Sequence, residues 1–303
     1  LIDIVAHTPE QADRGMSRLE NLLQAYENTH IFVARDEADA ERYWKDRKRL
    51  GAIASRTNAF KLNEDIVLPL DVTAEFTRFV EEYNLEEERY NQLTTVRGLW
   101  EYLKTAEPLE TPEWLSTKHV RMEELCSEAL KNLDHAPDGD LRNRMVIDQL
   151  SHDLLDLLRG YELVSATVSN IVEEISRRLI VIATHMHAGD GNVHVNIPVF
   201  SNDLEMMQRA AETADRIMDK AVEMGGVVSG EHGIGITKLK YLDRDRLDAL
   251  NDYRKEIDPG ELMNPGKLSD LTVPDRVFTP SFNLLGLEAS ILQRGALKTV
   301  SDS

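Results

Sequence analysis

Apolar positions follow two different periods along this chain, and the change of period separates a middle part from the two ends. Short apolar runs alternate with segments of helical period in the first third. The pattern predicts strands at 2–6 and 31–34, helices at 9–26 and 37–51, and an extended segment at 60–70. Pro69 disfavours a helix in that last segment, because the residue before a proline is pushed out of the α region.

The middle part, from residue 73 to about 179, is mostly of helical period. One apolar stripe consists of Leu150, Leu154, Leu157 and Leu158, and a second extends from Val164 to Leu179. Stripes of this kind are typical of a face that packs in a core or an interface. The acidic run Glu86-Glu87-Glu88 is expected to form a solvated face.

Strand and helix patterns return in the last third of the chain. We expect strands at 179–187, 192–200 and 227–229, and helices at 203–224 and 244–257. Gly225-Gly226 is a suitable stop for the first of these helices, because glycine accepts the left-handed conformation that follows a helix end. The residues after 268 show no strong period.

Composition limits the possible classes of protein. With 42% hydrophobic and 29% charged residues, the 303-residue chain has the composition of a globular protein with one large domain or two small ones. A formal net charge of -19 argues against nucleic acid and anionic membranes as partners. No apolar stretch reaches the ~20 residues of a membrane span, and no signal peptide is visible. Because the chain lacks an initiator methionine, it could be part of a longer protein.

Cys126 is the single cysteine of the sequence. One cysteine excludes an internal disulfide and an iron–sulfur cluster held by this chain alone. It lies in a segment of helical period, so we expect a buried, unreactive thiol rather than a nucleophile. The usage of cysteine predicts a reducing, cytoplasmic location.

The segment from His187 to His194 is the most informative in the sequence. Asp190-Gly191 favours a two-residue hairpin turn, which would place His187 opposite His194 with Cβ atoms roughly 5 Å apart. His185 and Asn196 would form the next pair on the same face. Two imidazoles at that distance can share a metal ion. The alternative is a plain turn flanked by partly exposed histidines.

A second polar cluster, Ser229-Gly-Glu-His-Gly-Ile-Gly235, directly follows the short strand predicted at 227–229. Glu231 could add a carboxylate to the two histidines, and the neighbouring His232 could accept a proton. Two imidazoles and one carboxylate with an open position form a catalytic metal arrangement, typical of zinc and also possible for manganese or iron. A phosphate cradle is disfavoured, because the cluster lacks both the dinucleotide fingerprint and the P-loop lysine.

These two clusters, followed by Asp258-Pro259 and Asn264-Pro-Gly-Lys267, resemble the C-terminal domain of FAD-linked oxidases. That family includes D-lactate dehydrogenases, the flavin subunit of glycolate oxidase and D-2-hydroxyglutarate dehydrogenase. The strict resemblance covers 179–268, and a weaker one extends back through Trp44-Lys-Asp-Arg47 and Phe60–Pro69. It implies an α+β domain at 1–271 with a ferredoxin-like antiparallel sheet, packed helices and a helical insertion at 72–178, followed by a linker at 272–303.

The resemblance also implies roles for individual residues. His187, His194 and Glu231 match the family's metal ligands, and His232 matches its catalytic histidine. Asn196 matches a substrate-contacting asparagine, Arg47 matches an arginine that receives a substrate carboxylate, and Lys61 is a looser match for a substrate contact. FAD would be held mainly by a separate domain that precedes this region, and an iron–sulfur domain could follow it, as in large fused members.

We therefore expect the substrate- and metal-binding domain of a flavin-dependent 2-hydroxy acid dehydrogenase, inactive when isolated. Two alternatives come from other classes. A metal-dependent hydrolase would use the same His/His/Glu set without flavin, and an assembly domain would use the leucine-striped middle for subunit contacts.

Overall fold

The computed structural model describes residues 2–26, 30–34, 36–50, 60–106, 118–200, 202–235, 238–265 and 268, without the side chains of 46–50 and 60. Two compact units divide the chain, Leu1–Asn58 and Ala59–Ser303. The predicted linker at 272–303 lies outside the described residues, and each unit is considered by itself.

The first unit is built from helices α1, Pro9–Leu23, and α2, Glu37–Leu50, which confirms both predicted helices. Thr8 caps α1 by accepting the backbone N–H of Gln11. The strands predicted at 2–6 and 31–34 are wrong, since neither segment is a strand in the described structure. Val5 is 95% and Phe32 77% exposed. An apolar run becomes a strand only where a neighbouring strand pairs with it, and no described segment of this unit does so.

The second unit contains a sheet of three antiparallel strands, β1 (Phe60–Val67), β2 (Ala183–His187) and β3 (Asn192–Val199). Their order is β1-β3-β2. The strand predicted at 227–229 is reduced to a single bridge between Val227 and Val67, beside β1. With this bridge as a residual fourth strand, the elements follow the β-α-β-β-α-β order of ferredoxin-like units. The α+β class is confirmed.

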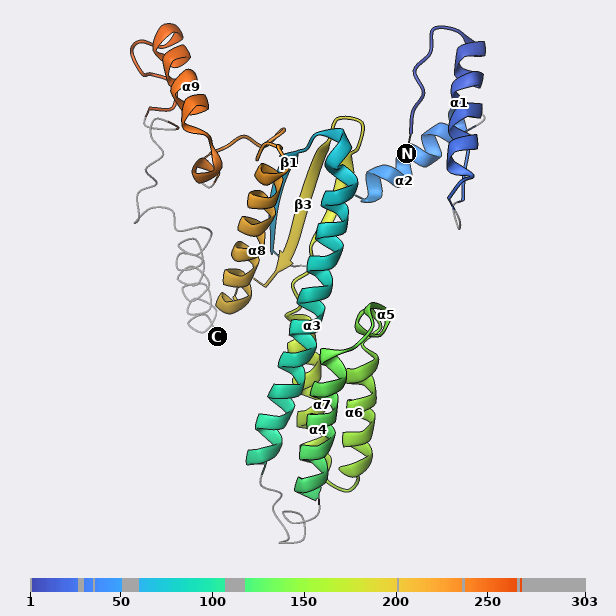
Figure 1. Ribbon diagram of the computed structural model, residues 1–303, viewed down its shortest axis with the longest axis vertical. Helices are drawn as coiled ribbons and strands as arrows, with labels where there is room; N and C mark the ends of the chain where they lie inside the picture. Colours follow the sequence, from blue (N-terminus) through green and yellow to red (C-terminus); the bar gives the residue numbers. More distant parts are fainter. Residues whose placement is uncertain are drawn as a thin grey trace, which may run out of the picture. The chain divides into compact units, whose positions relative to one another are not determined.

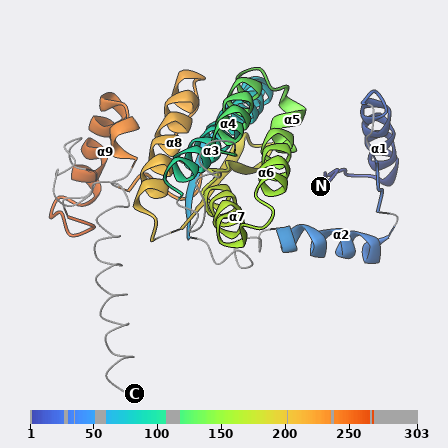
Figure 2. The same cartoon turned by 90° about the horizontal axis from the view of Figure 1, so that it is seen from below.

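Helices α3 (Thr73–Thr105) and α8 (Leu204–Glu223) lie side by side and cover the apolar face of this sheet (Figures 1 and 2). The core between them includes Ile66, Val193, Val195 and Ile197 from the strands, together with Phe76, Val80 and Ile217 from the helices. These side chains alternate along the strands with polar ones, as expected when one face of a sheet is buried. The opposite, polar face carries the candidate site.

The acidic run on α3 is only partly a solvated face. The side chain of Glu87 is 12% exposed and pairs with Arg209 of α8, while Glu88, also 12% exposed, pairs with Arg144. Glu86 is more than half exposed. Burial raises the pKa of the Glu87 carboxyl, and the Arg209 charge opposes this rise. The prediction was wrong for two of the three residues, because the arginines that bury them lie far away in sequence.

The far half of α3 belongs to a helical bundle with its own core (Figure 1). Its other members are α4 (His119–Asp134), α5 (Asp138–Arg142), α6 (Met145–Leu157) and α7 (Glu162–Arg177). Leu150, Leu154 and Leu158 are buried within it. The leucine stripe is therefore used as core. The remaining described elements are the short helices η2 (Leu70–Val72) and η4 (Leu239–Tyr241) and helix α9 (Arg244–Ile257).

In the part of the chain that the structure describes, none of the helices has the length and apolar character needed to cross a bilayer.

Cys126 provides a direct test of the bundle core. Its side chain is fully buried on α4, and burial raises the pKa of its thiol to about 11 from 9.0. Since the thiolate is the reactive form, that shift alone lowers its population at pH 8 by about 100-fold. We expect iodoacetamide to alkylate the native protein at least about 100-fold more slowly than the protein in urea. Equal rates in both states would show that α4 does not bury this residue.

Candidate metal centre

The hairpin that carries the histidines has a different register from the predicted one. His194 lies opposite His185, and His187 lies opposite Asn192, which leaves a four-residue loop at 188–191. A two-residue type I′ turn would need positive φ at both Asp190 and Gly191, but only Gly191 has it, at 68°. A side chain at Gly191 would place its Cβ 2.1 Å from the carbonyl oxygen of Leu68, so this close approach requires glycine.

The register differs by two residues, and this difference leaves the polar face intact. Because strand side chains alternate with a period of two, a shift of two keeps each residue on its predicted face. His185 and Asn196 do lie on the face of His194, with His185 Nδ1 3.3 Å from Asn196 Nδ2. The prediction that these residues share a face is confirmed, whereas the predicted pairing of His187 with His194 is wrong.

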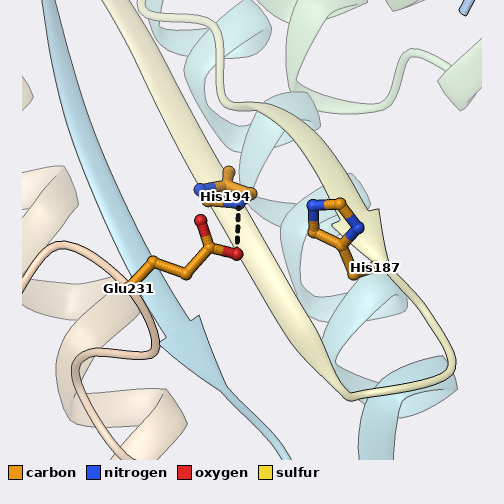
Figure 3. A group of neighbouring side chains, drawn as sticks. All are labelled: His187, His194 and Glu231. Atoms are coloured by element: carbon orange, nitrogen blue, oxygen red, sulfur yellow. Dashed lines mark ion pairs between the residues drawn. The ribbon is translucent and has the colours of Figure 1, made fainter.

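Three side chains on this face converge as expected for a metal centre (Figure 3). His187, His194 and Glu231 each offer a ligand atom, and these atoms all lie within 4.8 Å of one another. His194 Nε2 is 3.7 Å from Glu231 Oε1. Ligand atoms on a tetrahedral ion with bonds of about 2.1 Å lie roughly 3.4 Å apart, so the donors are close to the required spacing. The two imidazoles and one carboxylate therefore fit a divalent ion.

Asn192 orients the carboxylate of this group. Its Nδ2 donates a hydrogen bond to Glu231 Oε1 at 2.7 Å, while its Oδ1 is buried without a hydrogen-bond partner. A buried, unpaired carbonyl oxygen is costly unless a ligand group pairs with it. Asn192 was not singled out from the sequence, although it opens the strand predicted at 192–200, directly after the predicted turn, and alternates in phase with His194.

His232 lies beside the three converging side chains. Its ring centroid is 5.3 Å from that of His194, and its side chain is 36% exposed. The His232 Nδ1 atom lies 3.6 Å from Asp65 Oδ1. The ring is thus accessible from the polar face and lies against a buried carboxylate.

Asp65 is a second residue of the site that was assigned no role from the sequence. It is fully buried on β1, opposite His194, and its carboxylate accepts backbone N–H groups from Gly230, Glu231 and His232. Burial raises the pKa of Asp65, but these bonds and the one from Lys238 outweigh it and hold that pKa well below its usual range. The available signal was an acid directly before the apolar run Ile66-Val-Leu68.

The other predicted contacts occupy different places. Asn196 is half-buried on β3, in the row next to His194, and its Oδ1 is buried without a partner. Lys61 lies on the same face of β1, four residues before Asp65. Arg47 belongs to α2 in the first unit, and its side chain lies outside the described residues. The roles of all three remain predictions.

Comparison with known proteins bears on the origin of this arrangement. The glycolate oxidase subunit GlcD of Bacillus subtilis is 34% identical over 109 residues, which cover 33% of this chain and 23% of that protein. The mitochondrial D-lactate dehydrogenase [cytochrome] of Arabidopsis thaliana is 36% identical over 106 residues, 33% of this chain and 18% of the relative. The D-2-hydroxyglutarate dehydrogenase of Stutzerimonas stutzeri is 27% identical over 178 residues, 48% and 38% respectively.

The matched part of the chain thus corresponds to well under half of each of these relatives. A family described as FAD linked oxidases, C-terminal domain, matches residues 1–96 and 156–268. Residues 97–155, which build much of the helical bundle, lie outside that match. The match covers more than half of the chain, and the chain belongs to the family of FAD linked oxidases, C-terminal domain.

Proposed function

We propose that this chain is the substrate- and metal-binding domain of a flavin-dependent 2-hydroxy acid dehydrogenase. The observation that carries the proposal is the convergence of His187, His194 and Glu231 on the polar face of the sheet. The relatives are named for glycolate, D-lactate and D-2-hydroxyglutarate, and all three compounds carry a hydroxyl next to a carboxylate. A substrate of that class offers two oxygens to one cation.

In this proposal His187, His194 and Glu231 hold a divalent ion, zinc in the first place and manganese or iron as alternatives. When bound, such an ion lowers the pKa of a coordinated hydroxyl and neutralises developing negative charge. Asn192 keeps the Glu231 carboxylate turned toward His194 through its 2.7 Å hydrogen bond. Hydrogen bonds that orient a metal ligand in this way commonly change the metal affinity of a site.

The chain's other polar side chains bind the acid and remove its proton. His232 accepts the hydroxyl proton, as an imidazole can near neutral pH. Asn196 is proposed to contact the bound acid through its side-chain amide, which lies on the same face of the sheet as His194. Arg47 and Lys61 are assigned to the substrate carboxylate, for which a guanidinium is well suited because it binds bidentately.

The remaining partner is the flavin. A separate domain would hold FAD, which would supply the acceptor for the hydride of the α-carbon; oxidation of the 2-hydroxy acid to a 2-oxo acid would then be balanced by transfer of its hydroxyl proton to His232. An iron–sulfur domain following this region is the proposed onward electron carrier. We propose a cytoplasmic location on the evidence of the single, buried cysteine.

The test compares the isolated chain with the chain supplied with a flavin-binding domain. We expect the isolated chain to bind about one zinc ion per molecule and to reduce no dye when given glycolate, D-lactate or D-2-hydroxyglutarate. With the flavin domain, dye reduction should appear and should be abolished by a chelator.

Other outcomes would separate the alternatives. Hydrolysis of model esters or amides by the zinc-loaded chain alone would favour a metal hydrolase. Absence of zinc binding would overturn the proposal and leave an assembly role, although the leucine stripe is already buried inside the bundle.

A further inference from the structure

We infer that Asp65 is a positioning residue, whose buried carboxylate fixes the loop carrying Glu231 and His232 onto the sheet. The inference rests on the proposed function, because it explains how that centre is assembled. Glu231 and His232 lie on a loop that is distant in sequence from the strands carrying His187 and His194. Something must therefore hold that loop in register with β3.

The hydrogen bonds of Asp65 all converge on this loop and on one lysine. Its Oδ2 accepts consecutive backbone N–H groups from Gly230, Glu231 and His232, at 2.6, 2.5 and 3.1 Å. The Ser229 hydroxyl lies 3.3 Å from its Oδ1. Successive N–H groups around one anion form a concave backbone site, here occupied by a side chain of the protein itself.

The strand register places this anchor at the centre of the site. Asp65 lies directly opposite His194 on β3, so the residue that holds the loop is adjacent to a proposed ligand. The loop also approaches the sheet closely at Gly230, where an added Cβ would lie 2.8 Å from Val67 Cγ2 and 3.1 Å from Asn192 Nδ2. The spacing between loop and sheet is thus set from two sides.

Charge distinguishes Asp65 from an ordinary core residue. The Lys238 side chain is 5% exposed, and its Nζ donates to Asp65 Oδ1 at 2.7 Å and lies 3.1 Å from Glu64. A buried ion pair is weak evidence for stability, because desolvation offsets most of the attraction. An apolar side chain could fill the same space, but it could not accept N–H groups from three successive residues. We therefore assign the carboxylate to positioning.

The proposed metal ligand Glu231 depends on Asp65, because few other contacts hold the Glu231 side chain in place. The Glu231 side chain is 55% exposed, and the hydrogen bond from Asn192 is the contact that directs its carboxylate. If the backbone at 230–232 moved, Glu231 Oε1 and the His232 ring would both leave the face of His194. Removing Asp65 should therefore weaken metal binding without removing any ligand.

The experiment measures zinc affinity by competition with a chelator. It uses the full chain, in which His187, His194 and Glu231 are all unchanged. We expect Asp65→Ala to bind zinc about 10- to 100-fold more weakly, the range typical of residues that orient metal ligands without binding the ion. Asp65→Asn should bind zinc about as weakly, because the NH₂ of the asparagine would face the Lys238 ammonium, and both groups are hydrogen-bond donors. Combining Asp65→Asn with Lys238→Met should recover much of the affinity, since the amide could then donate to Ser229 Oγ while its oxygen accepts the loop N–H groups.

Glu87→Gln is the matched control, because it removes another largely buried carboxylate that pairs with a cation, here Arg209, and it lies on α3. It should lower the melting temperature and leave zinc affinity unchanged. Amide hydrogen exchange at 230–232 should accelerate in Asp65→Ala and remain as in the wild type in Glu87→Gln. If Asp65→Ala does not fold, the comparison of Asp65→Asn with the double variant decides.

The outcomes separate this inference from the proposed function. Wild-type zinc affinity in Asp65→Ala or Asp65→Asn, while His194→Ala loses zinc, would overturn the positioning role and leave the metal centre intact. A double variant no better than Asp65→Asn would also count against it. Full zinc affinity in His194→Ala would instead remove the proposed function itself.

Discussion

His194→Ala is expected to abolish stoichiometric metal binding. His194 is 7% exposed and lies between the other two proposed ligands, with His187 on one side and Glu231 on the other. Its removal leaves one imidazole and one half-exposed carboxylate, which hold an ion poorly. Loss of a residue that only hydrogen-bonds to a metal ligand typically costs about 10- to 100-fold in affinity. We expect a loss of more than about 100-fold, measured by elemental analysis after dialysis and by chelator competition.

His185→Ala is the matched control for this variant. His185 lies directly opposite His194 on the same face, and the two rings stack with centroids 4.7 Å apart. It is not one of the three converging ligands, so we expect its zinc affinity to stay within about 10-fold of the wild type. Two results would contradict the assigned ligand set. One is stoichiometric zinc in His194→Ala, and the other is an equal loss in both variants.

The set of side chains on the polar face could be predicted from the sequence, because every second residue of a strand points to the same face of the sheet. The expected hairpin paired His187 with His194, whereas the structure pairs His185 with His194. A slip of two residues preserves the face, and a slip of one would have reversed it. The actual loop could not be read from Asp190-Gly191, because that dipeptide does not fix the φ of Asp190.

Features that depend on distant partners could not be predicted. The segments at 2–6 and 31–34 have the apolar residues of strands but no neighbouring strand in the described first unit. Glu87 and Glu88 look solvated until Arg209 and Arg144 are brought against them. Asp65 was missed for the same reason, since the N–H groups that it accepts lie about 165 residues further along the chain. Local pattern carries no information about such pairings.

His232→Ala is expected to leave the metal bound and to lower substrate oxidation strongly. In the proposed mechanism His232 accepts the hydroxyl proton, and general base catalysis typically contributes about 10²- to 10⁴-fold to a rate. Its ring lies 5.3 Å from that of His194 and is not one of the converging ligands. We therefore expect a fall of that size in kcat for dye reduction by the flavin-complete enzyme, with zinc content unchanged.

Two further variants make this test specific to proton transfer. His232→Gln keeps a polar side chain that cannot accept a proton near neutral pH, so it should be as impaired as His232→Ala. His152→Ala removes a histidine from α6 whose side chain is 70% exposed, and it should retain wild-type turnover. Recovery of activity in His232→Gln would mean that the residue contributes hydrogen bonding rather than a base. Turnover within a few-fold of the wild type in His232→Ala would show that another group removes the hydroxyl proton and that His232 is not the base.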